Sequence, residues 1–262
     1  MEPKGYILFD IDGVIRDVTN SYRLAIQKTV ESYLGSIPSI GEIDKLKSEG
    51  CWNNDWDVSF ELLNRKQKQL NIQISLPSKN DLIEKFNNFY FGGDFKANSN
   101  TWKGYIRNEE LLINSKFFKT ISNLNIKWGF VSGAEPPSAK YVLEEKLGLI
   151  RPPLIAMDDA PEKPNPEGFL NLIEIISKSK IDKIDKPIAY LGDTVADVLT
   201  VVNARKTFPK QNFISFAVAP PHLHKKNKRE LRSIYEKKLI NSGADFILEK
   251  TYDLIGYLKK WK

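Results

Sequence analysis

A short apolar run near the start of the chain, Tyr6 to Phe9, is followed at once by Asp10, Asp12 and Gly13. This pattern predicts a buried parallel strand that presents side chains at its carboxyl end, the edge where open α/β sheets bind ligands. Strand alternation would place both carboxylates on the same side, where they repel each other unless a cation or a proton intervenes. Mg²⁺, which prefers oxygen ligands, would relieve that repulsion. The alternative is two solvated acids in a turn.

Two further apolar segments lead into polar side chains. Trp128 to Val131 precedes Ser132 and Gly133, and Pro187 to Leu191 leads to Asp193. Segments with apolar residues at helical spacing separate these strands, so we predict an α/β fold with a Rossmann-like parallel sheet as its core. The carboxyl edge of that sheet would collect Asp10, Asp12, Ser132, Lys163, Asp193 and Asp197.

Two of these residues, Lys163 and Asp197, lie near the predicted amino-terminal ends of helices. Lys163 lies in a proline-rich loop just before a helix predicted from Glu167 to Ile176. A cation beside free backbone N–H groups suits an anion, although a surface lysine in a turn is the alternative. If another helix begins near Thr194, Asp197 lies about one turn along it and faces the strand end.

The segment 18–104 is predicted to be an α-helical cap domain inserted into a core made of residues 1–17 and 105–262. Between Ile40 and Phe91 the apolar residues follow helical spacing, with polar turns between the helices. We expect the chain to return to the core near Gly104. Asn108 is then expected to cap a helix that runs from Glu109 to Ile121.

One loop of this insert, Trp52 to Asp57, combines indole rings, amides and carboxylates. Such groups suit a polar metabolite. We therefore expect Asn53, Asn54, Trp56 and Asp57 to determine substrate specificity. The alternative is that the tryptophans pack in the core and that an asparagine or aspartate caps the next helix.

Composition narrows the class of protein. Of the 262 residues, 41% are hydrophobic and 27% are charged, as in ordinary soluble proteins. The sequence lacks both a run of about 20 apolar residues and an apolar amino-terminal segment, so we expect neither a membrane span nor a secretory signal. A single cysteine, Cys51, excludes an intrachain disulfide and fits the cytoplasm.

The net charge of +6 mildly favours anionic ligands but is small for a nucleic-acid-binding protein, so we do not expect nucleic acid as a partner. The segment 222–238 is strongly basic. We interpret that segment as a solvated amphipathic helix, whose apolar side chains would face the protein: Leu231, Ile234, Tyr235 and Leu239.

Four motifs in this order resemble those of the haloacid dehalogenase superfamily: Phe9-Asp-Ile-Asp-Gly13, Val131-Ser-Gly133, Lys163-Pro164 and Gly192-Asp-Thr-Val-Ala-Asp197. The helical insert after the first motif is similar to the cap of the phosphoglycolate phosphatase and β-phosphoglucomutase branch. The resemblance implies that Asp10 is the nucleophile and Asp12 the general acid and base. It also implies a phosphate site and a Mg²⁺ site, formed respectively by Ser132, Gly133 and Lys163, and by Asp10, Asp12, Asp193 and Asp197.

The resemblance implies a Mg²⁺-dependent phosphatase that hydrolyses a small phosphorylated metabolite through an aspartyl-phosphate intermediate. Dehalogenases of the superfamily lack an acid two residues after the nucleophile, so Asp12 favours phosphoryl chemistry. One alternative is a phosphomutase or phosphotransferase on the same scaffold. Another is a catalytically idle protein that binds a phosphate ligand, which the complete set of motif residues argues against. The sequence specifies neither the substrate nor the oligomeric state.

Overall fold

The computed structural model describes residues 2–47, 49, 52, 54–71 and 75–261. The chain divides into two compact units, Met1–Asp17 with Leu111–Lys262, and Val18–Glu110. The division predicted from the sequence lay after residue 17 and again after residue 104. Two short strands, β2 (Arg16–Asp17) and β3 (Glu110–Leu111), form a separate two-stranded sheet where the chain passes between the units.

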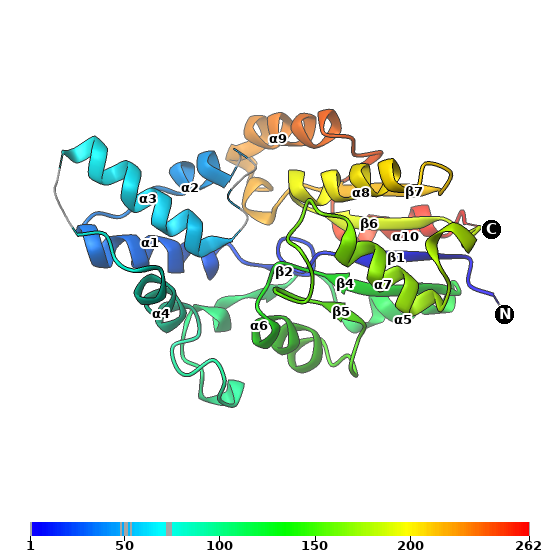
Figure 1. Ribbon diagram of the computed structural model, residues 1–262, viewed down its shortest axis with the longest axis horizontal. Coiled ribbons are helices and arrows are strands. Elements are labelled where there is room, and N and C mark those ends of the chain that lie inside the picture. The colour runs from blue at the N-terminus through cyan, green and yellow to red at the C-terminus, as the bar shows by residue number, and fades with distance from the viewer. Residues whose placement is uncertain (1, 48, 50–51, 53, 72–74, 262) are drawn as a thin grey trace. The chain divides into compact units, whose positions relative to one another are not determined.

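The first unit contains a six-stranded parallel sheet in the order β5-β4-β1-β6-β7-β8 (Figure 1). Its strands are β1 (Gly5–Phe9), β4 (Ile126–Val131), β5 (Leu154–Ile155), β6 (Ile188–Gly192), β7 (Phe213–Val218) and β8 (Phe246–Leu248). From β1 the chain adds β4 and β5 on one side and later adds β6, β7 and β8 on the other. The predicted Rossmann-like α/β fold is therefore confirmed, and β1 lies where the strand order reverses, the usual place for a ligand.

Alternating residues of β1 face two separate apolar clusters. Ile7 and Phe9 pack in one cluster, and Tyr6 and Leu8 pack in the other. The first cluster is covered by α5 (Ser115–Asn123), α6 (Pro136–Lys140) with the π-helical turn Tyr141–Lys146, and α10 (Leu254–Leu258). The second is covered by α7 (Glu167–Ser177) and α8 (Val195–Thr207). Because both faces are buried, the strands are nearly continuous apolar runs.

The helix predicted from Asn108 is wrong. Residues 105–108 form a 3₁₀ turn, and β3 follows it. The Leu112 N–H donates to the Ile15 carbonyl at 2.8 Å, so this backbone group pairs outside any helix. Helix α5 begins only after Asn114, whose side chain accepts from the Lys116 N–H at 3.1 Å. Asparagine was the correct type of cap, but the wrong asparagine was chosen.

The basic segment does form a helix, α9 (Arg229–Asn241), but two of its apolar residues do not face the protein as predicted. Leu239 is buried and Tyr235 packs beside it, whereas Leu231 and Ile234 are 53% and 58% exposed. Tyr235 also donates a hydrogen bond to the Asp193 backbone carbonyl at 3.0 Å. Tyr235 and Leu239 are one turn apart on one face of the helix. Helix α9 therefore contacts its unit through these two residues, and Leu231 and Ile234, nearer its amino-terminal end, remain exposed.

The second unit is helical. It contains α1 (Tyr22–Leu34), α2 (Ile40–Lys47), α3 (Asp55–Leu70) and α4 (Lys79–Tyr90). Helix α1 packs against α3 and α4, and the rings of Tyr22 and Tyr90 stack with centroids 4.1 Å apart. The buried Tyr90 hydroxyl donates to Glu109 at 2.9 Å. None of the helices that the structure describes is long and apolar enough to cross a membrane.

Helix α3 begins in the loop that the sequence singled out for substrate specificity. The Asn54 side chain accepts from the Asp57 N–H at 2.8 Å and donates to the Asp57 carboxylate at 2.6 Å. Lys79 pairs with the same carboxylate at 3.1 Å. These are the contacts of the capping alternative. Asn53 lies outside the described residues.

We predict that Asn54→Ala lowers the free energy of unfolding by about 1 kcal/mol, because it leaves the Asp57 N–H without its cap. Asn54→Ser, which keeps an acceptor for the Asp57 N–H and adds no charge beside the Asp57 carboxylate, should retain most of the stability. Urea unfolding of both variants and the parent protein checks this. Equal stability of Asn54→Ala and the parent would contradict a capping role.

Candidate active site

The register of the central strands brings three chain segments to one edge of the sheet. Phe9 of β1 pairs with Phe130 of β4 and with Leu191 of β6. The residues that follow these strands therefore lie close together at the carboxyl edge. Asp10, Ser132 and Asp193 all lie there, and each is at most 8% exposed.

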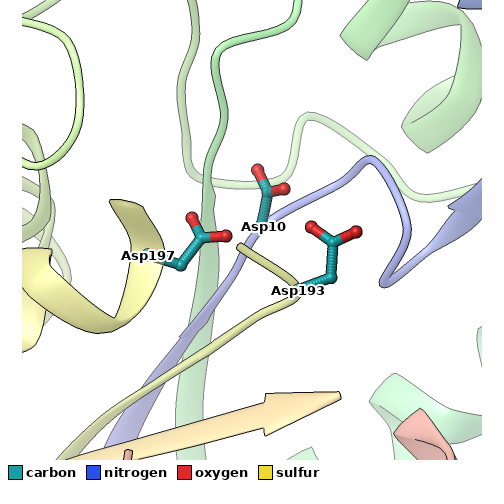
Figure 2. A group of neighbouring side chains, drawn as sticks. All are labelled: Asp10, Asp193 and Asp197. Carbon is teal, nitrogen blue, oxygen red and sulfur yellow. The ribbon is translucent and has the colours of Figure 1, made fainter. Parts of the chain in front are cut away.

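Three buried carboxylates meet at this edge. Ligand oxygens of Asp10, Asp193 and Asp197 lie within 4.8 Å of one another. Figure 2 shows the three groups converging from the end of β1, from the turn after β6 and from the first turn of α8. The structure thus brings together three of the four predicted metal ligands by their side chains.

Two glycines make this close approach possible. A Cβ atom on Gly13, whose φ is +76°, would lie 2.0 Å from Asp193 Oδ2. A Cβ on Gly192 would lie 2.2 Å from the Cβ of Asp197. Any larger residue at either position would displace an acid, so these glycines are part of the site's architecture.

Asp197 is held by the start of α8. Thr194 caps this helix, and Asp197 Oδ2 accepts from the Thr194 N–H at 2.9 Å and from its hydroxyl at 2.6 Å. This capping box uses one carboxylate oxygen. The other, Oδ1, is left to face the acid cluster, where it accepts from Lys163 at 2.5 Å.

Lys163 joins the nucleophile candidate to Asp197. Its Nζ lies 2.9 Å from Asp10 Oδ1 and 2.5 Å from Asp197 Oδ1, and its side chain is 15% exposed. The surface alternative considered for this lysine is therefore wrong. The ammonium compensates two of the three buried acids, as buried charges require.

Tyr190, which the sequence analysis did not select, belongs to the same network. Its hydroxyl lies 3.2 Å from Lys163 Nζ, 2.6 Å from the Val131 carbonyl and 3.3 Å from Asp197 Oδ1. The side chain is 1% exposed. The signal was a single tyrosine in an otherwise apolar strand, because a buried tyrosine hydroxyl usually needs a partner.

Asp12 lies beyond the end of β1, in the turn that follows. Its carboxylate accepts from Arg16 Nε at 2.6 Å and is 28% exposed, while the Arg16 side chain is fully buried. Asp12 is not one of the three clustered acids. Arg16 is a second residue that the sequence analysis missed, since an arginine beside an aspartate resembles any surface ion pair.

The predicted phosphate-binding residues follow β4. The Ser132 hydroxyl accepts from the Ala134 N–H at 3.2 Å, which orients it in the turn. Gly133 is exposed, and no atom lies within 4 Å of the position that a Cβ would take. A hydroxyl and an open backbone segment are thus available at the sheet edge beside Asp10.

Burial and crowding shift the pKa values of these groups. Burial, together with repulsion from Asp197 and Asp12, raises the pKa of Asp10 to about 7, although the Lys163 ammonium opposes this. Burial and repulsion from Asp10 and Asp197 raise the pKa of Asp193 well above its usual range. Burial would lower the pKa of Lys163, but attraction to Asp10 and Asp197 raises it well above its usual range.

The donor set fits a hard divalent cation. Three buried carboxylates face one ammonium, which leaves an excess of negative charge when all are ionised. Among the described residues, the hydrogen bond found for Asp193 is the one that its backbone carbonyl accepts from Tyr235, and its carboxylate is not engaged by it. Carboxylate oxygens that remain available in this way are the ligands that Mg²⁺ prefers. Asp10, Asp193 and Asp197 are therefore able to hold a metal ion.

The chain belongs to the haloacid dehalogenase-like hydrolase family, whose model matches residues 5–205. The family membership predicted from the four motifs is confirmed.

Solved structures of low sequence identity share its fold. A phosphatase from Thermococcus thioreducens is 20% identical, with a TM-score of 0.59 over 90% of this chain and 99% of that one. A phosphonoacetaldehyde hydrolase-like protein from Oleispira antarctica is 14% identical, with a TM-score of 0.68 over 99% and 94%. A putative β-phosphoglucomutase from Thermotoga maritima is 18% identical, with a TM-score of 0.59 over 99% of both chains.

A curated relative is considerably longer. An imidazoleglycerol-phosphate dehydratase from Phytophthora nicotianae is 27% identical over 249 residues, which are 94% of this chain and 50% of that protein. The chain therefore spans about half the length of this relative.

The raised pKa values predict how stability varies with pH. Without metal, folded Asp10 binds its proton up to about pH 7, whereas an unfolded aspartate releases it near pH 4. The folded state holds more protons in this window, so the contribution of Asp10 to stability falls as pH rises. The Lys163 contribution is constant there, because its raised pKa affects stability only above the pKa of an unfolded lysine.

We therefore predict that Mg²⁺ raises the melting temperature, and more so at about pH 8 than at about pH 5, because it binds the ionised acids. Thermal melts at both pH values, with NaCl of matched ionic strength as the control, measure this. Asp193→Asn should remove most of the gain. A gain of equal size at both pH values would contradict a metal site built from these acids.

Proposed function

We propose that the protein is a Mg²⁺-dependent phosphatase that hydrolyses small phosphate monoesters through an aspartyl-phosphate on Asp10. The observation that carries this proposal is the position of Asp10 at the carboxyl end of β1, paired with Lys163 inside a cluster of carboxylates. Aspartate acts as a covalent nucleophile in phosphoryl transfer. Membership in the hydrolase family supports this reading.

In the first step, an Asp10 carboxylate oxygen attacks the phosphorus and the bond to the ester oxygen breaks. The leaving alkoxide takes a proton from Asp12. Asp12 suits this role because it lies two residues after the nucleophile and its carboxylate is partly open to solvent.

In the second step, water attacks the phosphorus of the aspartyl-phosphate and gives a proton to Asp12. The bond between phosphorus and the Asp10 oxygen breaks, which releases phosphate and restores the carboxylate. The same residue thus acts as acid and then as base.

The remaining residues of the sheet edge hold the transferring group. Ser132 and the backbone of Gly133 supply hydrogen bonds to its oxygens. Lys163 neutralises charge and orients Asp10. Asp193, Asp197, the Asp10 carboxylate and the Asp12 backbone carbonyl would hold Mg²⁺, which neutralises phosphoryl oxygens when bound. In phosphoryl transfer such positioning and charge neutralisation account for most of the rate enhancement.

A phosphomutase is the second candidate, because one structural neighbour is a putative β-phosphoglucomutase. The two functions differ in whether water or a second hydroxyl accepts the phosphoryl group from Asp10. Free phosphate that appears in the absence of any acceptor distinguishes the phosphatase.

The choice of compounds to test follows from the relatives. The curated relative of twice the length is named for imidazoleglycerol phosphate. Phosphate esters of imidazole-bearing alcohols therefore belong in the test set, beside sugar phosphates, which the mutase-like neighbour suggests.

The role of the helical-unit loop in specificity remains a prediction. Asn54 and Asp57 bond to each other, which favours capping. In the part of the chain that the structure describes, the buried Trp56 Nε1–H has no hydrogen-bond partner. Because this N–H is buried, the contacts of the loop favour packing and capping over direct substrate binding.

We predict that the protein releases phosphate from such esters only with Mg²⁺ and that Asp10→Asn reduces the rate by several orders of magnitude, because it removes the nucleophile. Asp182→Asn is the matched control, since Asp182 lies in the turn Ile181–Lys183 and its side chain is 59% exposed. Circular dichroism confirms that both variants fold. Activity of Asp10→Asn above a few per cent of the parent value would rule out the covalent mechanism.

We further predict that Asp12→Asn turns over aryl phosphates with a burst. A phenolate leaves without a proton, so the first step survives, whereas hydrolysis of the aspartyl-phosphate loses its base. Rapid-quench measurements should show about one phenol per enzyme, followed by slow turnover. Linear release at the parent rate would show that Asp12 serves neither step.

A further inference from the structure

We propose that Tyr190 is a positioning residue that orients the Lys163 ammonium for phosphoryl transfer. The inference rests on the proposed function and assigns to it a residue outside the four sequence motifs. Tyr190 lies on β6, two residues before Gly192, and its side chain is 1% exposed.

Three oxygens surround Lys163 Nζ, which carries three N–H donors. They are Asp10 Oδ1 at 2.9 Å, Asp197 Oδ1 at 2.5 Å and the Tyr190 hydroxyl at 3.2 Å. Each acceptor restricts the orientation of the ammonium, and the tyrosine hydroxyl adds one to the two carboxylates.

The tyrosine is itself held in place. Its single hydroxyl proton can go to only one acceptor, and the Val131 carbonyl at 2.6 Å is much closer than Asp197 Oδ1 at 3.3 Å. Because the hydroxyl donates its proton in a hydrogen bond to that carbonyl, the lone pairs of the hydroxyl oxygen are left to accept from Lys163. The ring is fixed by an edge contact with Phe169, with centroids 5.7 Å apart.

This arrangement ties the ends of three segments together. Val131 directly precedes Ser132, Lys163 follows β5, and Asp197 lies in the first turn of α8. One hydroxyl thus links the strand that carries the phosphate-binding serine to the lysine beside the nucleophile. The network sits in an interior where an unsatisfied donor on an ammonium is costly.

The test is Tyr190→Phe, which removes the hydroxyl and keeps the ring. With saturating Mg²⁺, we expect kcat on the best phosphate ester to fall about tenfold and the Kd of inorganic phosphate, measured by calorimetry, to rise about tenfold. Tyr6→Phe is the matched control, because Tyr6 is buried in the same apolar cluster on β1. It should change neither quantity. Thermal melting verifies that both variants fold.

A double variant separates positioning from a general structural role. In a Lys163→Met background, adding Tyr190→Phe should change the Kd of phosphate less than twofold, because the group that the tyrosine orients is gone. The same tenfold change in both backgrounds would overturn the proposal. So would a Tyr190→Phe enzyme with the parent kcat and Kd, or one that binds phosphate more tightly.

Measurements on the parent protein distinguish a failure of the phosphatase proposal from a failure of the Tyr190 proposal. A parent protein that binds phosphate and hydrolyses esters, with an unaffected Tyr190→Phe variant, contradicts only the role of the tyrosine. A parent protein that does neither contradicts the phosphatase as well.

Discussion

The site depends on one interaction, the burial of the Lys163 ammonium between Asp10 and Asp197. These partners lie 153 and 34 residues away along the chain, at 2.9 Å and 2.5 Å. Removing one partner of a buried ion pair typically costs about 3–5 kcal/mol, because the other charge stays buried. This ion-pair network therefore holds together the end of β1, the proline-rich loop and the first turn of α8. Asp193 is a third buried carboxylate in the same cluster, so the site carries an excess of negative charge when all three acids are ionised.

The parallel sheet makes that interaction possible. Residues of β1 alternate between two apolar clusters, so the strand is covered on both faces. Its carboxyl end is the place where ligands bind in sheets of this type. The pairing of Phe9 with Phe130 and Leu191 then brings the acids and Ser132 to the same edge of the sheet. Gly13 and Gly192 allow the loops to approach closely. The core thus holds the polar side chains in place, and the reversal of strand order at β1 puts them where such sheets bind ligands.

Helices and strands were predictable from the sequence where burial of one face requires apolar residues at regular spacing. The strands of the sheet and most helices follow their apolar patterns, because a buried face must be apolar. Prediction failed where partners distant in sequence decide. The stretch around Leu112 pairs with Ile15 instead of forming a helix, and α9 contacts its unit through Tyr235 and Leu239 but not through Leu231 and Ile234. Local pattern carries no information about which neighbour a backbone group or a helix face will meet.

The sequence by itself determined the fold class, the family and the acids that line the sheet edge, because these depend on residue type and order along the chain. Only the tertiary structure decided which charges touch. It placed Lys163 between Asp10 and Asp197, paired Asp12 with a buried Arg16, and brought the Tyr190 hydroxyl to the lysine. Such contacts arise from the register of strands and the packing of helices, so a tyrosine in an apolar strand becomes a polar contact only when the sheet assembles around it.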